Sequence, residues 1–100
     1  MLKFALIGYG YWGPNVARNL YKNKNINFKY ICDLKQERLD LAKDLYANDL
    51  QYTRSFDDIL SDASIDAVCL AVETSAHYEL AKRVIDSGKH LYVEKPFTSN

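Results

Sequence analysis

Three of the chain's four glycines lie at positions 8, 10 and 13, and this spacing strongly limits the folds that the sequence can adopt. Gly8, Gly10 and Gly13 follow an apolar run at residues 3–7 and precede a stretch with helical periodicity that Pro14 opens. Proline suits the first turn of a helix, because the N–H that it lacks would have no partner there. The pattern Gly-x-Gly-x-x-Gly between a strand and a helix predicts a tight turn whose backbone can approach a bound group closely.

The same order of strand and helix repeats along the rest of the chain. Further strands are predicted at residues 28–32, 52–53, 66–72 and 90–93, and helices at 36–46, 55–60 and 75–87. Strands that alternate with helices form right-handed βαβ units and therefore a parallel sheet. We expect an α/β fold of the Rossmann type: a doubly wound parallel sheet of about five strands, in the order 3-2-1-4-5, truncated at its C-terminal end.

Composition argues against several kinds of partner. Thirteen basic residues balance thirteen acidic ones without a basic stripe, so we expect no nucleic acid partner. No apolar stretch approaches the roughly 20 residues of a membrane-spanning helix, and the N-terminus lacks the features of a signal peptide. We therefore expect a cytoplasmic protein with no membrane partner. Two cysteines and no cluster of histidines give no metal-site spacing, so no metal is expected.

An acidic residue completes the pattern begun by the glycines. Asp33 ends the second predicted strand, 20 residues beyond Gly13, which is the separation expected for a carboxylate that binds the ribose hydroxyls of a dinucleotide. In such a site Gly8 permits the tight turn, Gly10 lets the backbone approach a pyrophosphate, and Gly13 allows close packing of helix and strand. The chain is therefore predicted to bind a dinucleotide.

The phosphates of that dinucleotide would be held by the first turn of the helix. Backbone amides near Tyr11, Trp12 and Gly13 would donate to them, aided by the positive end of the helix dipole. The side chains of Tyr11 and Trp12 stay open between packing around the loop and contact with a substrate.

Asp33 also bears on which dinucleotide binds. A carboxylate accepts hydrogen bonds from ribose hydroxyls and repels a 2′-phosphate, so NAD is the expected cofactor, with NADP possible. Arg38 lies one turn into the next predicted helix. It is either a solvated helix charge or a residue that reaches the adenosine.

Three stretches of the chain resemble one known family. They are residues 7–15 (IGYGYWGPN), 77–81 (HYELA) and 88–96 (GKHLYVEKP). In this order they are similar to the glucose–fructose oxidoreductase and inositol dehydrogenase (Gfo/Idh/MocA) family. The resemblance implies the NAD(P)-binding domain of an oxidoreductase that transfers hydride between a nicotinamide cofactor and a hydroxyl or ketone of a sugar, polyol or nucleotide sugar. The chain differs at Val72-Glu73, where members commonly have Thr-Pro.

The resemblance also implies roles for single residues. Lys95 would be the catalytic residue, with its ammonium on the reacting oxygen, rather than an ordinary charge at a strand end. Glu94 would lie beside the nicotinamide or its ribose, or else pair with a neighbouring lysine. Pro96 would set the bend after the strand. For His77 a structural role is expected.

Members of the family join this domain to a C-terminal substrate domain. We therefore expect residues 1–100 to be an N-terminal dinucleotide-binding domain, incomplete at its C-terminal end, with the substrate domain absent from this chain. The 100-residue chain alone is expected to be inactive, and the full-length protein to be a homo-oligomer. The alternative function is a non-catalytic NAD-binding or redox-sensing module. A methyltransferase would also place glycines after its first strand, but the third glycine and residues 94–96 argue against it.

Overall fold

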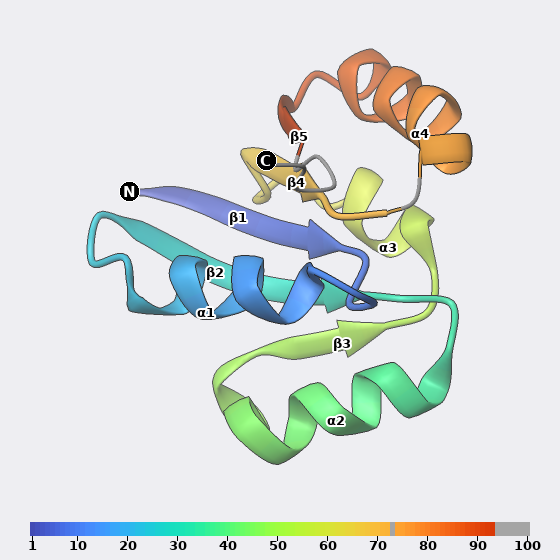
Figure 1. Ribbon diagram of the computed structural model, residues 1–100. Coiled ribbons are helices and arrows are strands. Elements are labelled where there is room, and N and C mark those ends of the chain that lie inside the picture. Colours follow the sequence, from blue (N-terminus) through green and yellow to red (C-terminus); the bar gives the residue numbers. More distant parts are fainter. Residues whose placement is uncertain (73, 94–100) are drawn as a thin grey trace, which may run out of the picture.

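A five-stranded parallel sheet forms the centre of the molecule (Figure 1). The computed structural model describes residues 1–72 and 74–93, with only the backbone described at 74–77. The strand order is β3-β2-β1-β4-β5, and each neighbouring pair runs in parallel. The predicted Rossmann-type fold and strand order are confirmed.

Strands and helices alternate along the chain. The strands are β1 (Leu2–Ile7), β2 (Ile26–Cys32), β3 (Gln51–Thr53), β4 (Ala67–Leu70) and β5 (His90–Val93). The helices are α1 (Gly13–Lys22), α2 (Gln36–Tyr46), α3 (Phe56–Leu60) and α4 (Thr74–Asp86), and a short 3-10 helix, η1 (Ala47–Asp49), follows α2. Every predicted element is present, and its ends differ from the prediction by at most two residues, whereas η1 was not predicted.

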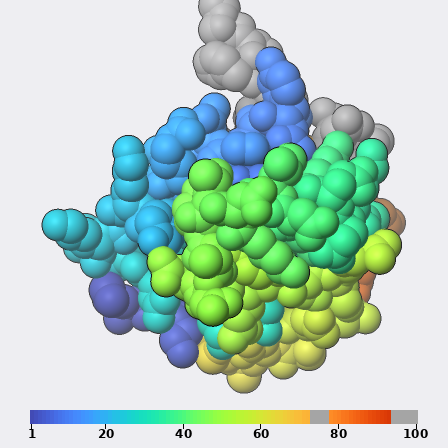
Figure 2. Space-filling model, turned by 90° about the horizontal axis from the view of Figure 1, so that it is seen from below, coloured from blue at the N-terminus to red at the C-terminus, as the bar shows by residue number. Residues whose placement is uncertain are grey.

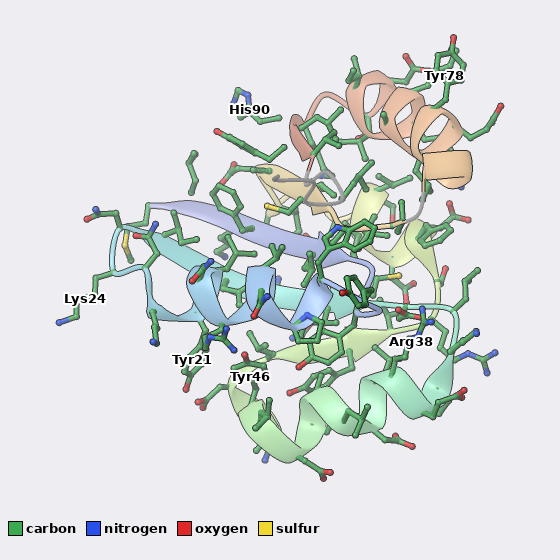
Figure 3. All side chains as sticks on the ribbon, in the orientation of Figure 1. Tyr21, Lys24, Arg38, Tyr46, Tyr78 and His90 are labelled. Carbon is green, nitrogen blue, oxygen red and sulfur yellow. The ribbon has the colours of Figure 1, made fainter. Side chains whose placement is uncertain are left out.

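Helices cover both faces of the sheet, and each face has its own apolar core. Helices α1 and α2 lie side by side on one face, blue and green in Figure 2, where Tyr21 and Tyr46 bring their ring centroids within 4.8 Å (Figure 3). Helices α3 and α4 cover the other face. Alternate residues of a strand point to opposite faces. Accordingly, Leu6 of β1 packs in the core beneath α1 and α2, and Ile7 in the core beneath α3 and α4.

A bulge in β2 changes which of its side chains point into each of these two cores. Phe4 pairs with Phe28, whereas the next residue of β1 pairs with Tyr30, so Lys29 is an extra residue in β2. Because the extra residue reverses the alternation, Phe28 and Ile31 both belong to the core beneath α1 and α2 although three positions separate them. The Lys29 ammonium leaves the strand toward the Asp62 carboxylate, 3.2 Å away.

Candidate functional site

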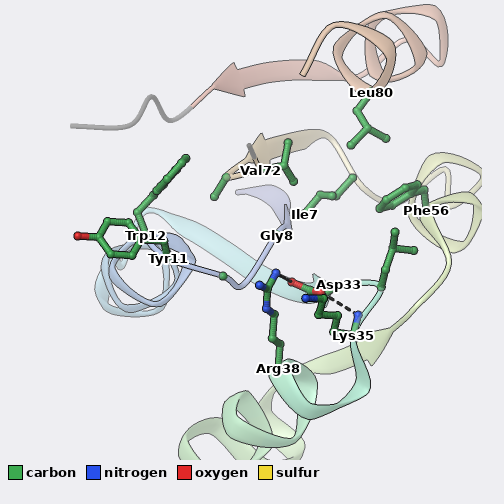
Figure 4. A pocket seen from close by; sticks show the side chains of 13 residues that line it. Ile7, Gly8, Tyr11, Trp12, Asp33, Lys35, Arg38, Phe56, Val72 and Leu80 are labelled. Carbon is green, nitrogen blue, oxygen red and sulfur yellow. Dashed lines mark hydrogen bonds and ion pairs between the residues drawn. The ribbon is translucent and has the colours of Figure 1, made fainter. Parts of the chain in front are cut away.

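The loops that follow β1, β2 and β4 border a groove at the carboxyl edge of the sheet (Figure 4). The groove encloses about 380 Å³. It lies where the strand order reverses between β1 and β4, which is the place where open parallel sheets bind their ligands. Six of the predicted site residues line it: Gly8, Gly10, Tyr11, Trp12, Asp33 and Arg38.

Two of the three glycines are required by the shape of the turn itself. Gly8 has a φ of +106°, and a Cβ added to it would overlap the carbonyl oxygen of Ala71, the residue that follows β4. Its N–H donates to the carbonyl oxygen of Cys32, at 2.8 Å. A Cβ on Gly13 would in turn overlap the carbonyl oxygen of Gly8. The turn is therefore closed against both neighbouring strands and against the start of α1, and side chains larger than hydrogen do not fit at either position.

Gly10 has different surroundings, because its open side faces the groove. An added Cβ would lie 2.9 Å from Nη1 of Arg38. The guanidinium of Arg38 therefore reaches across from α2 and fills the space that the missing side chain leaves (Figure 4). Arg38 therefore lines the groove, and its contact with the adenosine of a cofactor stays a prediction.

Asp33 joins the glycine turn to the start of α2. Its side chain is 5% exposed. Oδ2 accepts the N–H of Tyr9 at 2.8 Å, and Oδ1 accepts the N–H of Lys35 at 2.9 Å. Nη1 of Arg38 lies 3.6 Å from Oδ2. A second role for Asp33, which the spacing of the motif did not reveal, is to hold the loops after β1 and β2 in one place.

The carboxylate of Asp33 retains capacity for further donors. A carboxylate has about four lone-pair sites on its two oxygens. The N–H groups of Tyr9 and Lys35 occupy one on each oxygen, and the guanidinium of Arg38 faces Oδ2. One site on Oδ1 is left for a new donor, and a second on Oδ2 becomes available if Arg38 moves aside.

The first turn of α1 presents donors without a competing side chain. Trp12 is the N-cap residue, but it makes no side-chain capping bond, and the first turn contains no acidic residue. Within residues 1–72 and 74–93, no acceptor is found for the amides of Gly10, Tyr11, Trp12 or Gly13. Unpaired amides and the positive end of a helix dipole together favour an anion.

Tyr11 and Trp12 form an aromatic pair at one end of the groove. Their ring centroids are 5.8 Å apart and the ring planes meet at 83°, so the rings pack edge to face. Tyr11 is 93% exposed, whereas Trp12 is partly buried and packs against the core beneath α1 and α2. The two side chains that the sequence left undecided therefore differ: Trp12 is fixed by packing and Tyr11 is not.

The opposite end of the groove is apolar, and the sequence did not predict it. Leu34, Phe56 and Leu80 line this end, and they come from the loop after β2, from α3 and from α4. Leu34 is 59% exposed in the structure. In the sequence, the available signal was an apolar residue directly after Asp33, outside the predicted strand. Phe56 and Leu80 could not be found in this way, because only the tertiary fold brings them to the groove.

Several predicted residues lie outside the part of the chain that the structure describes. These are Glu73, Glu94, Lys95 and Pro96, together with the side chain of His77. Their predicted roles stay predictions.

Two features of the described residues bear on partners and metals. None of the helices in this part of the chain has the length and apolar character needed to cross a bilayer. Within the same residues, no three His, Cys, Asp or Glu side chains cluster as metal ligands do.

Known proteins similar to this chain include dehydrogenases of inositols and oxidoreductases whose substrates are not named. Inositol 2-dehydrogenase of Salmonella typhimurium strain LT2 is 25% identical over 96 residues, which is 95% of this chain and 29% of the enzyme. The crystal structure of scyllo-inositol dehydrogenase from Lactobacillus casei, with bound NAD(H) and scyllo-inositol, matches with a TM-score of 0.83 and 27% identity. That of myo-inositol 2-dehydrogenase from Lactobacillus plantarum matches with a TM-score of 0.82 and 28% identity.

These matches cover nearly all of this chain but only a small part of each relative. They cover 96% of this chain but 28% of the Lactobacillus casei chain, and 95% of this chain but 28% of the Lactobacillus plantarum chain. The chain thus spans less than a third of the length of these relatives. A model of the oxidoreductase family with an NAD-binding Rossmann fold matches residues 2–100. The chain therefore belongs to this family, Gfo/Idh/MocA, and its fold is the family's NAD-binding Rossmann fold.

Proposed function

We propose that this chain is the N-terminal cofactor-binding domain of an NAD-dependent dehydrogenase that acts on a hydroxyl group of a sugar or polyol. The observation that carries the proposal is the buried carboxylate of Asp33, fixed beside a glycine turn and the uncapped start of α1. Support for the substrate class comes from the similarity to inositol dehydrogenases. Because the chain spans 28% of the Lactobacillus casei chain, the activity of the whole protein is part of the proposal.

The residues of the groove fit a dinucleotide. The amides at the start of α1 suit the negatively charged pyrophosphate, and the absence of a side chain at Gly10 leaves room for it once Arg38 moves. Leu34 and Phe56 offer apolar surface to a base beside Asp33. When bound, NAD supplies the hydride-accepting ring, and the protein binds and orients it.

Asp33 would select NAD over NADP. A ribose hydroxyl can donate to the lone-pair site that remains on Oδ1, whereas a 2′-phosphate would bring a second negative charge to the carboxylate. Two unit charges 4 Å apart repel by about 4 kcal/mol at an effective dielectric constant of 20. Solvent access reduces this to about 1–3 kcal/mol, or roughly 5- to 150-fold in affinity. Arg38 opposes the effect, because its guanidinium can move from Asp33 to the phosphate.

The chemical step would use residues beyond β5. We propose that the Lys95 ammonium hydrogen-bonds the oxygen of the reacting hydroxyl and lowers its proton affinity, with Glu94 beside the nicotinamide or its ribose. A substrate domain would close the site and orient the hydroxyl, which is why the 100-residue chain alone should not turn over. We also propose that the whole protein assembles as a homo-oligomer, for which light scattering is the test.

Binding and turnover test the proposal separately. Titration calorimetry of the chain with NAD, NADP and ADP-ribose should show binding, with NAD tighter than NADP. Asp33→Ser should lower the affinity for NAD and raise the affinity for NADP relative to that for NAD. The protein that carries the remaining chain should then reduce NAD with a sugar or polyol from a panel, and Lys95→Met should abolish this reduction without loss of NAD binding. Binding without turnover on any member of the panel would instead indicate a redox-sensing module.

A further inference from the structure

The side of the sheet that α1 and α2 cover is open at one end. These two helices pack mainly against β1, β2 and β3. β4 and β5 form the other end of the sheet (Figure 1), and among the described residues the helix that packs against β5 is α4, on the opposite side. A hollow of about 810 Å³ lies between α1 and β5 as a result.

Aromatic and aliphatic side chains form the floor of this hollow. Tyr92 of β5 is in register with Cys69 of β4. It leans across this small side chain, so that its ring centroid lies 5.5 Å from that of Phe4 on β1. Leu20 of α1 lines the hollow as well, and Tyr92 is 49% exposed. The floor is therefore an apolar surface that the described part of the chain leaves partly uncovered.

The rim of the hollow carries amides and no charges. Asn15, Asn19 and Asn23 recur every four residues along α1 and its C-cap, so they follow one side of the helix. None of the described residues that line the hollow is charged, although 26% of the chain is. The centres of protein interfaces are depleted of charged residues and enriched in aromatic ones. The hollow thus has the composition of a docking surface.

A further unit of the same sheet would not cover this surface. α4 joins β4 to β5 and lies on the opposite face, as a right-handed crossover requires. By the same rule, a strand added beyond β5 would place its connecting helix beside α4. The occupant of the hollow is therefore a more distant segment of the polypeptide or a second molecule.

We propose that the hollow between α1 and β5 is the surface on which the substrate domain of the whole protein docks. The inference rests on the proposed function, because it takes the polypeptide beyond residue 100 to form that domain. This chain spans 28% of the Lactobacillus casei dehydrogenase, so a protein of that length has ample chain for a second domain.

The hollow also adjoins the cofactor groove, which favours the substrate domain over a second copy of the chain. Tyr11 and Trp12 line both the groove and the hollow. In Figure 4 these two side chains lie on the side of Gly8 that faces away from Asp33. If the adenosine ribose binds at Asp33, the nicotinamide lies toward Tyr11 and Trp12, and a domain docked in the hollow can bring a substrate to it.

Docking gives the exposed ring of Tyr11 a function. The ring is 93% exposed although it packs edge to face on Trp12. Between a docked domain and the cofactor, this ring would be covered and would help to exclude water from the place of hydride transfer.

Thiol labelling compares the hollow in the two forms of the protein. Asn19→Cys places a thiol in the hollow at an exposed position of α1, and Asp44→Cys is the matched control at an exposed position of α2. In the 100-residue chain, a maleimide should label both thiols at similar rates, with the wild type as background for the two buried native cysteines. In the protein that carries the remaining chain, Asn19→Cys should react at least about 10-fold more slowly, because a covered thiol reacts only when the domains separate. Asp44→Cys should keep its rate. Equal rates for Asn19→Cys in the two proteins would overturn the inference.

Cross-linking identifies what covers the hollow. A photoreactive benzophenone attached to Asn23→Cys, on the rim, should join this position to a peptide from beyond residue 100 of the same polypeptide, so that the denatured product keeps the mass of one chain. A product at twice that mass, joined to a second copy, would overturn the inference. Neither measurement needs a cofactor. Failure of the wild type to bind NAD would therefore refute the proposed cofactor site and leave these results standing.

Discussion

Replacement of Asp33 should destabilise the protein even when no cofactor is present. If Asp33 served only as a ligand for ribose, the cofactor-free protein would be indifferent to its loss. In the structure, however, the carboxylate accepts the N–H groups of Tyr9 and Lys35 and lies 3.6 Å from the Arg38 guanidinium. Asp33→Ser and Asp33→Asn should therefore loosen the glycine turn as well as weaken NAD binding.

The magnitude follows from the number and kind of bonds lost. A hydrogen bond to a charged group contributes about 1.5–3 kcal/mol. Serine can replace at most one of the two amide bonds, and the half-exposed Arg38 adds less than about 1 kcal/mol. We therefore expect Asp33→Ser to lower the free energy of unfolding by about 2–4 kcal/mol, which corresponds to a fall in Tm of roughly 10–25 °C for a domain of this size. Asp33→Asn should also destabilise, because its NH₂ group would face one of the two N–H donors.

Thermal unfolding followed by circular dichroism, without nucleotide, is the appropriate assay. Asp86→Asn is the matched control, because this carboxylate is 64% exposed and, among the residues that the structure describes, pairs only with Lys82 of the same helix. We expect the control to change the free energy of unfolding by less than about 0.5 kcal/mol. If both Asp33 variants melted as the control does, the structural role assigned to this carboxylate would be wrong.

Three further predictions concern backbone, thiol and carboxylate chemistry. Gly8→Ala should prevent stable folding, because Gly8 has a φ of +106° and its added Cβ would overlap the backbone of Ala71. Gly88→Ala is the control: its φ is +85°, nothing lies within 4 Å of the added Cβ, and the free energy of unfolding should fall by only about 1 kcal/mol. Chemical denaturation compares the two variants. Burial raises the pKa of Cys32 to about 12, so iodoacetamide at pH 8 should modify it only after unfolding, as peptide mass spectrometry would show. Hydrogen bonds from the Ser64 side chain and backbone lower the pKa of Asp62 to about 2. The ionised Asp62 carboxylate should therefore contribute fully to stability above its unfolded pKa near 3.8, and this contribution should disappear as the pH falls toward 2. Asp62→Asn should flatten this part of the acid denaturation curve.

The secondary structure and topology could be predicted because their signals are local or general. Apolar periodicity marks each strand and helix, and the right-handed βαβ rule leaves few orders for five parallel strands. The bulge at Lys29 could not be predicted in this way. The bulge depends on how β2 pairs with β1, and no residue type in the run from 26 to 32 indicates it.

The candidate site was predictable as far as the glycine motif extends. The motif marks Gly8, Gly13 and Asp33, and the structure gives each a physical reason to be that residue. It does not say which backbone amides converge on Asp33, because that depends on how two loops meet. Nor does it place Arg38 over Gly10, since 28 positions separate them and the contact depends on the conformation of one long side chain.

The most direct test of the account is to map where NAD binds. Titration of the ¹⁵N-labelled chain with NAD, followed by amide chemical shifts, reports on every loop at once. We predict that the largest changes fall on the amides of residues 8–13, among them Tyr9, which donates to Asp33, and on the amide of Lys35, which donates to the same carboxylate. In the same ¹⁵N spectra, the Nε–H signal of Arg38 should shift as its guanidinium leaves Gly10. Changes confined to other parts of the molecule, or none at saturating NAD, would contradict the assignment of the groove as the cofactor site.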